Sequence, residues 1–270
     1  MIRLRVLFYS LVTVLLVSVV LLAQLRARNS EDTLKADNAG RTPVLVELFT
    51  SEGCSDCPPA DALLARLDRS QPIDGAELIV LSEHVDYWNG IGWKDPYSSH
   101  QYSQRQTAYG ELFRLGSVYT PQMIVDGRYE FVGSDQRRAT EAIKDATLTE
   151  KVKVSLTSAH LESDSVIAVH VEAGPLPASV TADSANVWLA VADEQDESHV
   201  NGGENGGRTL RHVAVVRTLK MIGKVDRSDQ FSSDLEVNVG HARGKLRLIA
   251  FLQEMPTGRV VGASRADVGK

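Results

Sequence analysis

Residues 43–146 alternate between short apolar runs and segments with helical spacing, and this alternation restricts the possible folds more than any other feature of the chain. Short apolar runs are typical of buried strands, and apolar residues three and four positions apart indicate a helix. The expected strands are 43–50, 78–85, 122–126 and 129–132, and the expected helices are 60–67, 98–112 and a last one, capped by Ser134 or Asp135, that ends at Ala146.

The resulting order is strand, helix, strand, helix, strand, strand, helix. Strands separated by helices form parallel pairs through right-handed crossovers, and a closing hairpin at Asp126-Gly127 adds an antiparallel pair. This order predicts an α/β domain of the thioredoxin-like type over residues 42–150.

After Glu150 the pattern changes to strands without helices. The expected strands are 152–156, 166–172, 186–192, 210–219, 235–239 and 246–252, and breaks rich in Gly, Pro and Asp separate them. Several of them alternate apolar and polar residues, which is typical of strands with one buried face. The segment 151–270 is therefore predicted to form an antiparallel, all-β sandwich-like domain.

The N-terminus predicts export. Residues 6–23 carry no charge, and a helix that spans a bilayer needs about 20 apolar residues, with a lower limit near 17. No A-x-A-like cleavage site follows, so we expect residues 1–28 to hold an N-terminal transmembrane helix, an uncleaved signal anchor; a cleaved signal peptide is the alternative. Residues 29–41 are a polar linker, and the body is expected on the periplasmic side of the inner membrane.

The charge of the chain argues against nucleic acid as a partner. The net charge is −6, although the first 28 residues contribute four arginines and no acidic residue, so the exported body is strongly acidic. The expected partners are protein thiols or disulfides of the cell envelope, and the membrane through the N-terminal helix. No cofactor and no metal are expected.

Cys54 and Cys57 are the only cysteines and form a C-x-x-C pair between a buried strand and a helix. A thiolate is the nucleophile in disulfide exchange, and the N-terminus of a helix stabilises it. We expect Cys54 to be the exposed nucleophile and Cys57 to resolve the mixed disulfide. A structural disulfide and a metal-binding pair are the alternatives. Pro58 suits the first helical turn, which places Cys54 in the preceding loop.

Three more residues are candidates for the site. Thr120-Pro121 directly precedes a strand, where thioredoxin-like folds carry a cis-proline, so we expect a cis bond there that presents backbone groups beside the cysteines; a trans loop proline is the alternative. Glu47 is an acid inside an apolar strand; a buried carboxylate there would have a raised pKa and could accept a proton from Cys57, and a structural role is the alternative. His84 ends a strand, where it could approach the cysteines as an acid, a base or a metal ligand. A structural role through hydrogen bonds is the alternative.

Several motifs together resemble those of a known family. They are the run Glu47-Leu-Phe-Thr-Ser-Glu-Gly-Cys-Ser-Asp-Cys-Pro-Pro-Ala-Asp61, then His84-Val-Asp-Tyr-Trp88, Gly92-Trp-Lys-Asp-Pro96, Tyr119-Thr-Pro-Gln122 and Gly203-Glu-Asn-Gly-Gly-Arg-Thr-Leu-Arg-His212. The chain resembles an uncharacterised family of secreted bacterial thioredoxin-like proteins, known only as a domain of unknown function. The resemblance covers Thr42 to the C-terminus and implies a thioredoxin-like domain with a C-terminal β extension, without a proven reaction.

The glycine-rich part of the last motif has two interpretations. Its backbone N–H groups could wrap an anion with the help of Arg208. The other interpretation, which we favour, is a hairpin loop in which Glu204, Asn205, Arg208 and His212 form a polar network between the two predicted domains.

These features predict a thiol–disulfide oxidoreductase of the cell envelope that acts through Cys54, Cys57, Pro121 and Glu47. Two alternatives stay open. One is a non-catalytic interaction protein with a structural disulfide. The other is a copper-handling protein that uses Cys54, Cys57 and His84, because soft thiolates favour Cu(I); the four methionines of the chain form no tract that would strengthen it.

Overall fold

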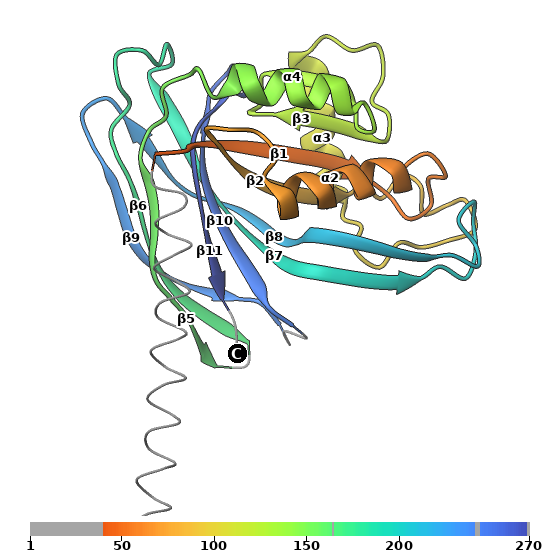
Figure 1. The fold of residues 1–270 in the computed structure, drawn as a ribbon. Helices are drawn as coiled ribbons and strands as arrows, with labels where there is room; N and C mark the ends of the chain where they lie inside the picture. Colours follow the sequence, from red (N-terminus) through yellow and green to blue (C-terminus); the bar gives the residue numbers. More distant parts are fainter. Residues whose placement is uncertain (1–39, 164, 241–243, 269–270) are drawn as a thin grey trace, which may run out of the picture. The chain divides into compact units, whose positions relative to one another are not determined.

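The computed structural model describes residues 40–163, 165–240 and 244–268 (Figure 1). The described helices are α2 (Pro58–Ser70), α3 (His100–Leu112) and α4 (Gln136–Ala146). The described strands are β1 (Thr42–Thr50), β2 (Ala76–His84), β3 (Gln122–Val125), β4 (Tyr129–Val132), β5 (Val154–Ser163), β6 (Val166–Ala173), β7 (Ser184–His199), β8 (Thr209–Asp226), β9 (Phe231–Asn238), β10 (Leu246–Glu254) and β11 (Val260–Val268).

The predicted anchor, residues 1–28, and most of the predicted linker lie outside the described residues. In the part of the chain that the structure describes, no helix is long and apolar enough to cross a membrane.

Eight strands form one large mixed sheet in the order β11-β10-β7-β8-β2-β1-β3-β4, and β5, β6 and β9 form a second sheet in the order β5-β6-β9. The strands β1 and β2 are parallel along their whole length, and β3 pairs with β1 in the antiparallel direction. The strand β8 joins the large sheet next to β2, where Ser82 and Val215 form a parallel bridge. The long β7–β8 hairpin therefore belongs to the same sheet as β1 and β2 (Figure 1).

The predicted fold class, a thioredoxin-like α/β domain followed by an all-β sandwich-like domain, is wrong. The described chain is mostly β, and strands from both predicted segments share one sheet. The physical reason is that β10 is buried on both faces. Ile249 and Phe251 belong to the same core as Leu45 and Leu64, whereas Leu248 and Leu252 pack in the core that includes the three-stranded sheet.

The individual elements of the first segment follow the expected ranges closely, and all six strands expected after residue 150 are present. The strand β11 was not expected, because its sequence Val-Val-Gly-Ala-Ser-Arg-Ala-Asp-Val has few large apolar residues. The domain boundary at residue 150 stays a prediction.

The helices cover both faces of the sheet near β1. Leu63 of α2 and Ile143 of α4 join the core formed with Leu48 of β1. Tyr109 of α3 packs instead with Phe49 and with Ile124 of β3. Successive residues of a strand point to opposite faces, so α3 lies on the face opposite to α2 and α4, as Figure 1 shows.

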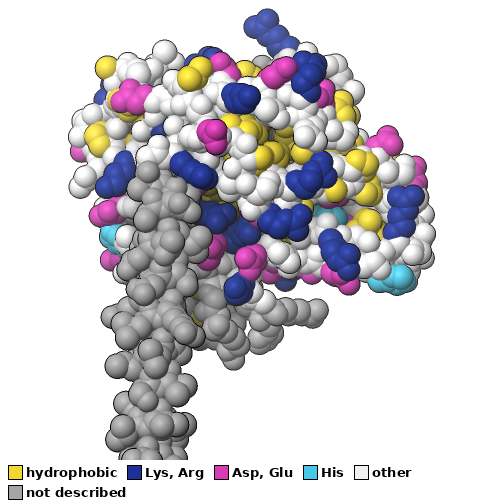
Figure 2. Space-filling view, in the orientation of Figure 1, with side chains coloured by type: hydrophobic (Ala, Val, Ile, Leu, Met, Phe, Trp, Pro, Cys, Tyr) yellow, Lys and Arg dark blue, Asp and Glu magenta, His cyan; other side chains and the backbone are white. Residues whose placement is uncertain are grey.

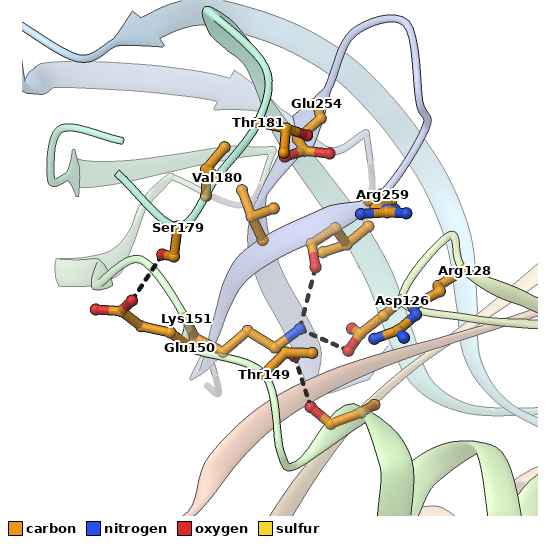
Figure 3. Close-up of a pocket in the computed structure, with 13 residues that line it drawn as sticks. Asp126, Arg128, Thr149, Glu150, Lys151, Ser179, Val180, Thr181, Glu254 and Arg259 are labelled. Carbon is orange, nitrogen blue, oxygen red and sulfur yellow. Dashed lines mark hydrogen bonds and ion pairs between the residues drawn. The ribbon is translucent and has the colours of Figure 1, made fainter. Parts of the chain in front are cut away.

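A buried ion pair fixes the chain where it leaves α4. The ammonium group of Lys151 lies 2.5 Å from Asp126 Oδ2 and donates a hydrogen bond of 3.0 Å to the carbonyl oxygen of Val260 (Figure 3). Asp126 also accepts a hydrogen bond from the backbone N–H of Leu45 at 2.9 Å. The pocket of about 280 Å³ around these residues therefore has its central charges paired within the protein, and we interpret it as structural.

The surface carries both signs of charge. On the face shown in Figure 2, Lys and Arg side chains are interspersed with Asp and Glu side chains. This mixture differs from the basic stripe that marks a nucleic-acid interface.

Candidate functional site

The two cysteines are joined by a disulfide at the turn from β1 into α2. The helix begins at Pro58 and Cys57 is its N-cap residue, as the two prolines indicate. The backbone N–H of Cys57 donates to the carbonyl of Cys54 at 3.3 Å, and the N–H of Asp61 donates to the carbonyl of Cys57 at 3.1 Å. The cysteine pair thus lies at the N-terminal end of α2, where the helix dipole favours negative charge, although Pro58 and Pro59 supply no backbone N–H there.

Both cysteine side chains are buried. Cys54 is 1% exposed and Cys57 is 0% exposed, whereas Ser55 and Asp56 between them are exposed. The expectation that Cys54 is the exposed cysteine is therefore wrong for this oxidised state. A protein substrate cannot reach either sulfur unless the residues that cover them move.

The predicted cis bond at Thr120-Pro121 is confirmed, and it lies beside the disulfide. The Sγ atom of Cys54 is 3.9 Å from the carbonyl oxygen of Thr120. The indole N–H of Trp88 donates to Thr120 Oγ1 at 2.8 Å, which fixes this segment from the loop after β2.

Glu47 is buried, but its carboxylate faces α3 and not the cysteines. Its carboxylate accepts hydrogen bonds from Arg105 Nε at 2.7 Å and from the hydroxyl of Tyr109 at 2.6 Å, both on α3. It pairs in register with Ile124, whose side chain packs on α3. Among the described residues, no hydrogen bond or ion pair joins Glu47 to either cysteine.

Glu83 completes this buried group. Its Oε1 atom is 3.5 Å from Arg105 Nε. Burial raises the pKa of Glu83 well above its usual range; Arg105 opposes this effect and Glu47 adds to it. One guanidinium therefore lies beside two buried carboxyl groups, and burial favours the neutral form of Glu83.

His84 has a structural partner. Its Nδ1 atom is 2.7 Å from Asp95 Oδ2, and the same carboxylate oxygen accepts the backbone N–H of Glu52 at 2.9 Å. Burial would raise the pKa of Asp95, but His84 and these hydrogen bonds lower it. His84 thereby fixes the chain two residues before Cys54. Within the described residues, no group of three or more His, Cys, Asp or Glu side chains is arranged to hold a metal ion.

His212 of β8 lies between two buried carboxylates that flank the cysteines. Its Nε2 atom is 3.5 Å from Glu52 Oε1, and its Nδ1 atom is 3.7 Å from Asp61 Oδ1. Burial by itself lowers the pKa of His212, but Asp61 and Glu52 raise it to about 10. The charged imidazole thus connects the residue two positions before Cys54 with the first turn of α2.

The residues between β7 and β8, 200–208, form a hairpin tip that covers the cysteine loop. The side-chain amide of Asn205, which is 0% exposed, donates to the carbonyls of Glu52 at 2.9 Å and of Cys54 at 2.8 Å. Glu204 accepts the backbone N–H of Ser55 at 3.0 Å. Figure 1 shows the tip beside the loop that precedes α2.

Glu204, Asn205, Arg208 and His212 were predicted to form a polar network between two domains; the structure instead brings Glu204, Asn205 and His212 onto the cysteine loop within one shared fold. Arg208 donates to Asn205 Oδ1 at 2.9 Å, which orients the amide toward the cysteine loop. The tip turns at Gly203 and Gly207, which have φ angles of 68° and 82° that suit glycine. Sequence reasoning missed Glu52, Asp61 and Asp95 as site residues; their presence in the quoted motifs was the available signal.

Comparisons with known proteins identify a family and structures of similar fold. The profile of a family described as "Protein of unknown function (DUF1223)" matches residues 45–253. A solved structure of a protein from Agrobacterium tumefaciens is 26% identical and superposes with a TM-score of 0.62, covering 83% of this chain and 94% of its own. HBP35 of Porphyromonas gingivalis is 14% identical with a TM-score of 0.58, covers 84% of this chain and 76% of its own, and shares the fold alone. No curated protein matches the sequence.

Proposed function

The chain belongs to DUF1223, a family of unknown function, and we propose that this member is a thiol–disulfide oxidoreductase of the cell envelope that acts through Cys54 and Cys57. The observation that carries the proposal is the disulfide between the only two cysteines, at the N-terminus of α2. This position stabilises a thiolate once the bond is reduced. The segment Thr120-Pro121 beside Cys54 is where the backbone of a substrate would lie.

The exchange proceeds in two steps. The thiolate of reduced Cys54 attacks one sulfur of a substrate disulfide, which forms a mixed disulfide and releases one substrate thiolate. The thiolate of Cys57 then attacks Cys54 Sγ, which forms the Cys54–Cys57 bond and releases the second substrate thiolate. Two electrons pass from the cysteine pair to the substrate, and the two substrate thiolates take up protons. A second dithiol protein returns the pair to its reduced form.

The burial of the disulfide adds a requirement. Asn205 and Glu204 hold the hairpin tip on the cysteine loop, and both sulfurs are covered. Exchange with a protein therefore needs the tip to separate from the loop. Local opening of this kind is common for loops held by a few polar contacts.

A second candidate function is favoured by the same burial. In this reading the disulfide is structural, and the protein is a non-catalytic interaction protein of the envelope. The reduction potential separates the two candidates, because structural disulfides have potentials below about −300 mV and exchanging pairs lie above that value.

Trapping of substrates tests the proposal. Without a resolving thiol a mixed disulfide persists, so the Cys57→Ala variant should accumulate mixed disulfides with envelope proteins. Cys54→Ala is the matched control and should accumulate none. The reverse pattern would exchange the roles of the two cysteines. If neither variant traps a protein and the potential lies below about −300 mV, the structural disulfide becomes the better explanation.

The proposed location follows from the uncharged run 6–23, which lies outside the described residues. We place the body on the periplasmic side of the inner membrane, held by an uncleaved N-terminal helix. Mass spectrometry of the membrane fraction should find the first 28 residues on the mature protein. A mature N-terminus after residue 23 would exclude the anchor.

A further inference from the structure

A pocket of about 670 Å³ opens between α3 and the strands β7, β8 and β10. Its walls include Ala108 and Leu112 of α3, Trp188 of β7, Leu219 of β8 and Met255, which follows β10. None of the residues that line it belongs to the cysteine loop or to the hairpin tip. Its volume lies within the range of about 300–1,000 Å³ that is typical of small-molecule sites.

The mouth of the pocket exposes large apolar side chains. Leu112 is 43% exposed and Met255 is 53% exposed, and both line the pocket. Trp188 and Leu219 continue the apolar surface inward. An apolar body that entered here would remove these side chains from water.

Two polar side chains of β7 line the wall, and the indole Nε1 of Trp188 is buried without a hydrogen-bond partner among the described residues, although buried polar groups are nearly always paired. Asn186 of β7 is 8% exposed and lines the pocket. Its side-chain amide offers both a donor and an acceptor to a molecule in the pocket.

The charge of the inner wall is balanced. Arg105 lines the pocket and lies 2.6 Å from the carboxylate of Glu47. Burial raises the pKa of Glu83, the other acid beside Arg105, well above its usual range and favours its neutral form. The charge of Arg105 is therefore already paired with Glu47 within the protein, and a charged molecule would lose its hydration without gaining a counter-charge.

We propose that this pocket binds a small uncharged amphipathic molecule, whose apolar body contacts Trp188, Leu219 and Met255 and whose hydroxyl or amide group pairs with Asn186. The site is independent of the cysteine chemistry, since the two share no lining residue.

Three soluble probes of equal size test the proposal: benzyl alcohol, benzoate and benzylammonium. Each is titrated into the ¹⁵N-labelled full-length protein while the indole N–H signal of Trp188, assigned with the Trp188→Phe variant, is followed by NMR. Benzyl alcohol should shift this signal in a saturable way, and both ions should bind at least about tenfold more weakly because a buried charge has no partner here. Equal binding of the ions, or a shift that does not saturate, would overturn the proposal.

Two variants locate the binding. Ala108 is exposed on α3, so Ala108→Trp should fill the mouth of the pocket without disturbing the core, and it should abolish the saturable shift. Asn186→Leu should weaken benzyl alcohol binding about two- to tenfold, the range for the loss of one net hydrogen bond. Unchanged affinity in Ala108→Trp would show that the alcohol binds elsewhere.

Discussion

Asn205→Ala tests whether the hairpin tip controls access to the disulfide. The substitution removes the hydrogen bonds to the carbonyls of Glu52 and Cys54, at 2.9 and 2.8 Å. At about 1 kcal/mol of net stabilisation each, the closed tip loses about 2 kcal/mol. Since every 1.4 kcal/mol is a factor of ten, the equilibrium between open and closed tip should shift about thirtyfold toward the open form.

The assay is the rate at which dithiothreitol reduces Cys54–Cys57 in the folded protein. When the tip recloses faster than the reductant attacks, this rate is proportional to the open population, so Asn205→Ala should be reduced about thirtyfold faster than the wild type. Arg211→Ala is the matched control on the same hairpin, because Arg211 forms an exposed ion pair with Glu197; we expect less than about a twofold change. Reduction of Asn205→Ala at the wild-type rate would refute the idea that the tip covers the sulfurs.

Three other variants test the core and the buried charges. Arg105→Met leaves the carboxylate of Glu47 buried without its charged partner and should lower the free energy of unfolding in urea by about 3–5 kcal/mol. The control Arg137→Ala, in an exposed pair on α4, should change it little, and equal effects of the two variants would contradict the role of burial. Because the pKa of His212 is raised to about 10, the charged His212 stabilises the folded protein fully below about pH 6.5, and this contribution is lost as the pH rises toward 10. The melting temperature should therefore decline less steeply over this interval in His212→Gln than in the wild type. Phe251→Ala should lower the free energy of unfolding by about 3–5 kcal/mol, and α2 and β10 should still unfold in one cooperative transition because Phe251 packs in the core that both share. Separate transitions in circular dichroism and fluorescence would show two independent cores.

The position of the cysteine pair was predictable from local sequence. Pro58 and Pro59 cannot donate hydrogen bonds and suit a first helical turn, so they place Cys57 at the N-cap of α2, as found. The cis bond before β3 and the polar network of the glycine-rich hairpin were also predicted from their motifs. The cysteine turn and the cis bond each involve a few neighbouring residues, whereas the contacts of the polar network join residues about 150 positions apart.

The direction of Glu47 depended on tertiary structure. Its position in an apolar strand indicated burial, which is confirmed, but not which face of the sheet it occupies. Pairing with Ile124 directs it to α3, where Arg105 is its partner. The sequence contains no local signal for that partner, because Arg105 is 58 residues away along the chain.

By itself the sequence determined where most strands and helices lie, because their apolar spacing and their turn residues act over a few positions. Only the tertiary structure decided which strands are neighbours. The alternating pattern of β7 and β8 is compatible with a separate sandwich as well as with an extension of the first sheet. Burial of both faces of β10 selected the single sheet, and this choice brought Asn205 and His212 onto the cysteine loop. Such contacts join residues about 150 positions apart, and they form because packing two apolar faces at once removes more surface from water than either face alone.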